Sequence, residues 1–186
     1  KAIVTIKSEA SSSSAESGAK KTYYGGFFTE PDKMGKIEVK GFQTVRGDSC
    51  KFLKTLFYGS NQYIINAKDP RAALQFIDES LDLMFLDDVD ISKFVMTTTL
   101  KQETYDIATV ASVMRDKIKK RDPGREPKLG DRIPYVLVKG FGKDPKSRDL
   151  AETPLFAIEN NMELDLKYYY EHKIIPGLKK AFDWPF

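Results

Sequence analysis

The N-terminal part of the chain carries the patterns of short β-strands separated by polar turns. Ala2–Lys7 alternates apolar and polar residues as a strand does, whereas Ser8–Ala19 is rich in Ser and has no periodicity, which predicts a loop. Tyr23–Phe28 and Lys36–Lys40 are rich in aromatic or β-branched residues and flank Glu30–Gly35, where Pro and Gly favour a turn. This pair of segments is therefore predicted to form a β-hairpin.

From Asp48 the apolar positions recur at helical spacing, and Asp48 is of a residue type that caps a helix N-terminus. A second helix is predicted to begin at Asp69 and Pro70, because proline is favoured in the first helical turn. Phe94–Thr98 is predicted to be a short strand after this helix. The predicted inward-facing residues are Leu53, Leu56, Phe57 and Ile64 in the first helix, and Ala73, Phe76, Ile77, Leu81 and Met84 in the second.

A third helix is predicted over Tyr105–Lys120, with Ile107 among its inward-facing residues and with basic residues at its C-terminal end. The next segment contains Pro and Gly and leads to an alternating strand, Ile133–Lys139. The chain ends in a helical tract, Leu166–Phe182, in which Pro176 is expected to cause a kink. Together these elements predict an α+β fold, in which a hairpin precedes a mainly helical region that holds a small β element.

The composition is that of an ordinary globular protein, with 41% hydrophobic and 31% charged residues among 186. No apolar run approaches the roughly 20 residues that span a membrane, and no leader pattern is present, so we expect an intracellular protein without a membrane anchor. The single cysteine, Cys50, excludes an internal disulfide and a multi-cysteine zinc site. Because the sequence opens with Lys1 and not with Met, it is expected to be part of a longer chain.

A net charge of only +3 conceals a strong segregation of charge along the chain. Residues 112–148 contain 12 Lys or Arg and 5 Asp or Glu, a balance of +7. Residues 69–90 contain 7 acidic residues and one basic residue, a balance of −6. Such segregation favours a basic face that binds a polyanion, and two solvated faces of opposite charge are the alternative.

Catalytic and metal-binding patterns are weak. Asp87, Asp88 and Asp90 close a predicted helix without the ligand spacing of a calcium loop. His172 is the only histidine, and the sequence contains no Gly-x-Ser-x-Gly, phosphate loop or dinucleotide fingerprint. Mechanisms that depend on histidine, such as triad or zinc hydrolysis, are therefore disfavoured.

Two short basic motifs flank the predicted hairpin. Lys20-Lys21-Thr22-Tyr23 precedes it, and lysines on long stems can pair with phosphate or probe the minor groove without reading sequence. Lys40-Gly41 and Arg46 follow it, where glycine permits close approach of a backbone and arginine can bind phosphate in a bidentate manner. For a lysine pair taken alone, simple solvation is the alternative.

Read in order, these and further segments resemble the carboxy-terminal palm and thumb of family B DNA polymerases, most closely the delta-like eukaryotic and viral type. The resemblance spans residues 20–182, and the order of the motifs makes it specific. The segments are Lys20–Tyr23 (Lys-Lys-x-Tyr in the family), Lys40–Asp48 (Lys-Gly-x-Glu-x-x-Arg-Arg-Asp), Asp90–Val95 (Asp-Ile-Ser-x-Leu-Val), Arg121–Gly124 with Leu129–Val136, Glu152–Phe156 and Asp165–Tyr169.

The resemblance implies the end of a palm over residues 1–47 and a thumb domain over residues 48–186, which grip primer-template duplex DNA during replication without sequence specificity. The implied DNA-binding residues are Lys20, Lys21 and Tyr23 near the growing end, Lys40, Gly41 and Arg46 at the primer strand, and Arg121, Arg125, Lys128 and Arg132 along the duplex backbone.

The chain also departs from the family pattern. Gly47 stands where the family has a second Arg, and the Ser-rich segment before Lys20 does not match the strand expected there. The Asp-Thr-Asp motif that holds two catalytic metals does not occur in this sequence. We therefore expect no cofactor in this chain and no nucleotide addition by it alone, and Mg²⁺ is implied only for the complete polymerase.

The implied partners are primer-template duplex DNA, the remaining palm, fingers and exonuclease parts of the polymerase, and a sliding clamp. The implied location is the nucleus or a viral replication compartment. One alternative is a stand-alone DNA-binding protein or the small subunit of a split polymerase. Another is a protein-interaction module that uses the acidic segment 69–90 and binds no DNA, and an enzyme active by itself is a third.

Overall fold

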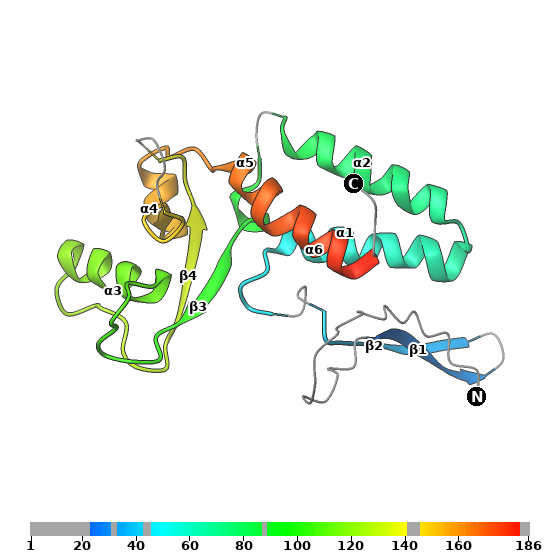
Figure 1. Ribbon diagram of the computed structural model, residues 1–186, viewed down its shortest axis with the longest axis horizontal. Coiled ribbons are helices and arrows are strands. Elements are labelled where there is room, and N and C mark those ends of the chain that lie inside the picture. Colours follow the sequence, from blue (N-terminus) through cyan, green and yellow to red (C-terminus); the bar gives the residue numbers. More distant parts are fainter. Residues whose placement is uncertain (1–22, 31–32, 43–45, 87–88, 141–145, 183–186) are drawn as a thin grey trace, which may run out of the picture.

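The computed structural model describes residues 23–30, 33–42, 46–86, 89–140 and 146–182. Within these residues, a helical region lies at one end, a tip that contains a small sheet lies at the other, and a hairpin runs along one side of the helices (Figure 1). The predicted α+β class is confirmed. The predicted strand and loop over residues 2–19 lie outside the described residues.

The hairpin consists of β1 (Tyr23–Glu30) and β2 (Lys33–Lys40), which pair antiparallel. It confirms the prediction, although both strands are longer than expected. Tyr24 on β1 is buried, with 2% of its surface exposed. Its ring packs edge-on against Phe57, 5.6 Å between centroids, and so attaches the hairpin to the helices.

Two antiparallel helices, α1 (Lys51–Gln62) and α2 (Pro70–Met84), form the centre of the helical region. The predicted start of α2 is confirmed, since the Asp69 carboxylate accepts hydrogen bonds from two backbone N–H groups of the first turn. The helices approach closely at Gly59, where an added Cβ would lie 2.5 Å from the Phe76 ring.

The predicted cap of the first helix is wrong. Asp48 lies in a turn, Cys50 occupies the N-cap position, and no side chain there accepts a hydrogen bond from the first turn. The position is buried, and Cys50 is fully enclosed by the core. Packing of the apolar face thus sets the start of α1 without a polar cap.

The tip is built on three antiparallel strands in the order β3 (Met96–Thr99), β4 (Arg132–Leu137) and β5 (Ala151–Glu152). The strands β3 and β4 confirm the predictions. The short strand β5 and the helix that follows it, α4 (Pro154–Glu159), were not predicted, although Thr153 caps that helix and Pro154 opens it.

The third helix, α3 (Val110–Arg121), begins five residues later than predicted. Thr109 and Ser112 form a reciprocal capping box, with hydrogen bonds of 3.2 and 2.8 Å, which fixes the first turn. The assignment of Ile107 to the buried face is therefore wrong: Ile107 precedes the helix and is 74% exposed.

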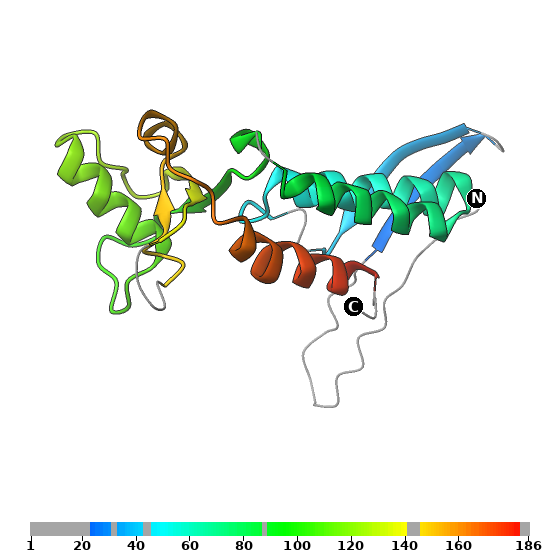
Figure 2. The ribbon, with the colours of Figure 1, turned by 90° about the horizontal axis from the view of Figure 1, so that it is seen from above.

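The C-terminal helical tract consists of α5 (Leu166–Tyr169), a π-helical turn (Tyr170–Ile174) and α6 (Ile175–Phe182). The predicted interruption exists as this π turn, which ends at Ile174, just ahead of Pro176. Proline has no N–H, and its ring clashes with the carbonyl four residues earlier, so a wider turn before it relieves both problems. Figure 2 shows α6 along one side of the α1–α2 pair.

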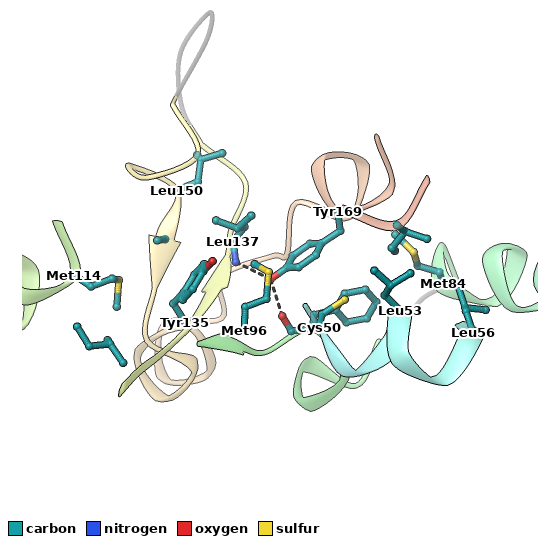
Figure 3. Close-up of a cluster of buried hydrophobic side chains, with 14 of the residues drawn as sticks. Cys50, Leu53, Leu56, Met84, Met96, Met114, Tyr135, Leu137, Leu150 and Tyr169 are labelled. Carbon is teal, nitrogen blue, oxygen red and sulfur yellow. Dashed lines mark hydrogen bonds between the residues drawn. The ribbon is translucent and has the colours of Figure 1, made fainter. Parts of the chain in front are cut away.

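One buried apolar cluster extends from the helical region into the tip, and Tyr169 lies at its centre (Figure 3). The Tyr169 hydroxyl donates to the Phe94 carbonyl at 2.8 Å and accepts from the Leu137 N–H at 3.0 Å. Burial raises the pKa of this phenol far above its usual range, so the hydroxyl stays protonated and can donate. The C-terminal tract is thereby bonded to the segment before β3 and to β4.

Candidate nucleic-acid interface

Exposed basic residues gather at the C-terminal end of α3 and in the loop that leads to β4. In the described part of the chain, four of these side chains form no ion pair with an acidic residue, and all four are exposed to solvent. Cations at a helix C-terminus are also favoured by the helix dipole. The four residues are Lys119, Lys120, Lys128 and Arg132.

The loop over residues 122–131 is shaped by its own carboxylates. Gly124 donates its N–H to Glu126 Oε2 at 2.7 Å, and Lys128 donates its N–H to Asp131 Oδ2 at 2.8 Å. Hydrogen bonds from backbone N–H groups lower the pKa of Glu126, so it remains ionised. Gly124 and Gly130 have φ values of +97° and +90°, which other residues rarely adopt. The loop therefore presents its basic side chains from an ordered backbone.

Two of the predicted contact residues, one in this loop and one at the end of α3, carry ion pairs. Arg125 is 3.4 Å from Asp122, in an exposed pair that leaves 83% of its side chain accessible. The Arg121 guanidinium pairs with the Glu152 carboxylate at 2.8 Å and lies over the Phe156 ring, 3.5 Å from the centroid, while 32% of its side chain remains exposed. Arg125 thus belongs with the mainly exposed cations, whereas Arg121 is engaged by a buried carboxylate.

The carboxylate that binds Arg121 is only 5% exposed and lies on β5. Lys117 also pairs with Glu152, at 2.7 Å. Burial raises the pKa of Glu152, but hydrogen bonds from Arg121 and Lys117 outweigh that effect, and its pKa lies below the usual value. Sequence reasoning gave Glu152, Lys117 and Phe156 no role. The signal for two of them was that Glu152 and Phe156 begin and end one of the segments that resemble the family.

At the other predicted site, the end of the hairpin brings Lys40 opposite Tyr23. Gly41 has φ of +82°, a conformation that favours glycine, and the buried Phe42 ring packs at a tilt of 50° against Phe57, 4.8 Å between centroids. Lys40, Gly41 and Arg46 are exposed. Lys20, Lys21 and the side chain of Tyr23 lie outside what the structure describes.

The segment after the hairpin is tied to the sheet of the tip. The Gly47 carbonyl accepts hydrogen bonds from the Thr97 N–H and the Thr97 hydroxyl, at 2.9 and 3.0 Å. A Cβ at position 47 would lie 2.7 Å from Thr97 Oγ1. The family pattern has arginine at position 47. Here Gly47 leaves room for the close contact with Thr97 on β3.

The hairpin and the basic loop lie along the same lower edge of the molecule in Figure 1, at opposite ends. Among the described residues, no group of three or more His, Cys, Asp or Glu side chains is arranged to hold a metal ion. A search of the same residues for a helix long and apolar enough to cross a membrane found none. The described residues thus carry two groups of exposed basic side chains, one after the hairpin and one at the end of α3 and in the loop that follows it.

Comparison with known proteins shows which proteins this chain is similar to. The DNA polymerase delta catalytic subunit of Drosophila melanogaster is 34% identical over 164 residues, which covers 88% of this chain and 15% of that protein. The corresponding subunit of Candida albicans is 31% identical and is covered over 16% of its length, again by 88% of this chain. The chain thus spans about one sixth of these relatives or less.

The family B DNA polymerase from the hyperthermophilic archaeon Pyrobaculum calidifontis shares the fold, with a TM-score of 0.68 and 22% identity over 90% of this chain and 21% of that structure. Residues 18–184 match the family model described as DNA polymerase family B. This chain therefore belongs to DNA polymerase family B.

Proposed function

We propose that this chain is the part of a family B DNA polymerase that holds the primer-template duplex, without reading its sequence. The observation that carries the proposal is the exposed basic cluster formed by Lys119, Lys120, Lys128 and Arg132, none of which forms an ion pair with an acidic side chain of the described residues. Exposed lysines and arginines bind phosphates at any sequence by displacing counterions.

Within this proposal, residues 1–47 belong to the palm and residues 48–186 form the thumb. Lys20, Lys21, Lys40 and Arg46 hold the duplex near the growing primer end, with Tyr23 and Gly41 beside them. The side chains of Arg125 and Lys128 in the loop, and of Arg132 at the start of β4, follow the backbone further along the duplex. The shared edge of hairpin and loop supports one continuous track for the DNA.

Nucleotide transfer itself is assigned to the complete polymerase. The Asp-Thr-Asp motif is absent from this sequence, so we expect Mg²⁺ to bind acidic residues of other parts of the enzyme. The expected partners are those parts, the duplex and a sliding clamp, and the expected location is the nucleus or a viral replication compartment.

Binding to a fluorescent primer-template duplex, measured as salt is raised, tests the proposal. The affinity of the parent chain is expected to fall steeply with salt and to be the same for unrelated sequences. A variant with Lys20, Lys21 and Arg46 changed to Ala is expected to bind more weakly and with a shallower salt dependence, by about 0.9 in the log–log slope for each lost phosphate contact.

A matched control removes three exposed basic residues elsewhere, by Arg71→Ala, Lys93→Ala and Lys167→Ala. It lowers the net charge equally, so it separates local contacts from the overall charge. An equal loss of slope in both variants, or no binding by the folded parent chain, would contradict the proposal.

A second candidate function rests on the opposite charge of α2. This helix exposes Asp78, Glu79 and Asp82, and the apolar residues Leu83 and Phe85 at its end are more than half exposed. An acidic surface with an apolar edge suits a basic, amphipathic protein partner. Absent or salt-independent duplex binding would favour this function over the first.

A further inference from the structure

The buried carboxylate of Glu152 forms ion pairs with two cationic side chains on one face of α3. Lys117 and Arg121 are one helical turn apart, so both point to the same side of the helix, where β5 supplies Glu152. Arg121 donates a hydrogen bond from Nη2 to Oε1 at 3.0 Å, and its Nη1 lies 2.8 Å from Oε2 as an ion-pair contact, although Oε2 accepts no hydrogen bond from the described residues. Lys119 lies across the helix from this face and is exposed.

The ammonium group of Lys117 has no hydrogen-bonding capacity left. Its three N–H donors match three acceptors: Glu152 Oε1 at 2.7 Å, the Ala151 carbonyl at 2.7 Å and the Asp149 carbonyl at 2.9 Å. A phosphate could bind this group only by displacing one of these partners. Lys117 is therefore a structural cation within a basic segment.

A ring contact, in addition to the ion pair, fixes the orientation of the Arg121 side chain. Its guanidinium lies over Phe156 on α4, and α4 begins directly after Glu152 through the cap residue Thr153. The same arginine is the last residue of α3, immediately before the loop 122–131. Whatever fixes Arg121 therefore fixes the direction in which this loop leaves the helix.

We propose that Glu152 is a positioning residue of the DNA-binding surface: it holds Lys117 and Arg121 away from phosphate and so sets the orientation of the basic loop. This inference rests on the proposed function and changes one assignment within it. Arg121 becomes a support of the surface, and the phosphate contacts at this end fall to Lys119, Lys120, Arg125, Lys128 and Arg132.

The salt dependence of duplex binding by the whole chain distinguishes contact from support, because its slope counts phosphate contacts. Lys119→Gln is the reference variant and is expected to lower the slope by about 0.9. Arg121→Gln is expected to weaken binding and leave the slope at the parent value. A slope that falls for Arg121→Gln as it does for Lys119→Gln overturns the inference.

The variant Glu152→Gln keeps the shape of the side chain and removes its charge. It is expected to steepen the slope by about 0.9 for each released cation that reaches a phosphate, and the double variant Glu152→Gln/Arg121→Gln is expected to reverse part of that gain. A purely structural role would leave the slope unchanged once the folded fraction, measured by circular dichroism, is taken into account. If Glu152→Gln does not fold, the Arg121→Gln result decides.

Failure of the proposed function and failure of this inference alone give different results. Absence of duplex binding by the folded parent chain overturns the proposed function and this inference together. Salt-dependent binding by the parent chain, with an unchanged slope in Glu152→Gln, overturns the inference alone.

Discussion

The side of the molecule that carries the hairpin and the tip that carries the basic loop are stabilised by different kinds of contact. The hairpin is attached by rings, since Tyr24 and Phe42 both pack on Phe57, which has no exposed surface. In the tip, a buried carboxylate with two cations around it joins α3 to β5 in addition to apolar packing. The first kind of contact is insensitive to pH, whereas the second depends on ionisation. Two sites proposed to bind the same duplex should therefore respond differently to acid.

The largest effect is expected for Phe57→Ala. This change removes the ring shared by Tyr24 and Phe42 and leaves a cavity in the helical region, which should lower the free energy of unfolding by about 3–5 kcal/mol. Urea denaturation followed by circular dichroism measures it. Leu155→Ala, at a residue that is 66% exposed, is the control and should change stability by about 0.5 kcal/mol or less. Similar losses in both variants would refute the ring attachment.

Tyr169→Phe should have an intermediate effect, because it removes only an oxygen from the junction between the two regions. The change leaves the Phe94 carbonyl and the Leu137 N–H without their buried partner, at a cost of about 1–3 kcal/mol. Thermal unfolding checks this, with Tyr168→Phe as the control at a partly exposed neighbour. Equal melting temperatures for the parent and Tyr169→Phe would show that the bridge adds nothing.

The smallest effect is expected from protonation of the Glu152 carboxylate in the parent chain, whose stabilisation is present at neutral pH and is lost on acidification. The folded-state pKa of Glu152 lies below the ordinary value of 4.5, so its stabilisation is present above that pH and is lost as the pH falls through the folded-state pKa. Denaturation of the parent chain between neutral pH and about pH 3 should therefore show a larger loss than denaturation of Glu152→Gln.

The exposed pair of Lys139 and Glu163 supplies the comparison for that experiment. Its carboxylate also has a lowered pKa, through its hydrogen bond with Lys139, but 72% of the Glu163 side chain is exposed, so solvent screens the pair. Glu163→Gln should follow the parent chain in acid. Parallel pH curves for all three proteins would contradict a special role for the buried carboxylate.

Elements with strong local signals could be predicted, and those set by packing could not. Asp69 and Pro70 mark the start of α2 in the sequence as clearly as in the structure. For the third helix, the apolar residue Ile107 favoured an early start, while the capping box of Thr109 and Ser112 decided the actual one. At α1, burial of Cys50 replaced the polar cap that Asp48 seemed to offer.

The candidate interface shows the same division. The basic loop could be predicted because its charges are adjacent in sequence. The pairing of Arg121 with Glu152 could not, since it depends on a carboxylate 31 residues away in the sequence. The pairing of Glu152 with Val136 brings the carboxylate close to α3. No pattern in the sequence predicts the register of a two-residue strand.

The π turn between α5 and α6 also acts as a phase correction. The buried positions Tyr169, Ile174 and Leu178 are spaced five and then four apart, whereas a regular α-helix returns to one face after three or four residues. A turn closed by i→i+5 bonds absorbs the additional residue and keeps all three side chains on the core. The tract thus tolerates one inserted residue without rotating its C-terminal half away from α1.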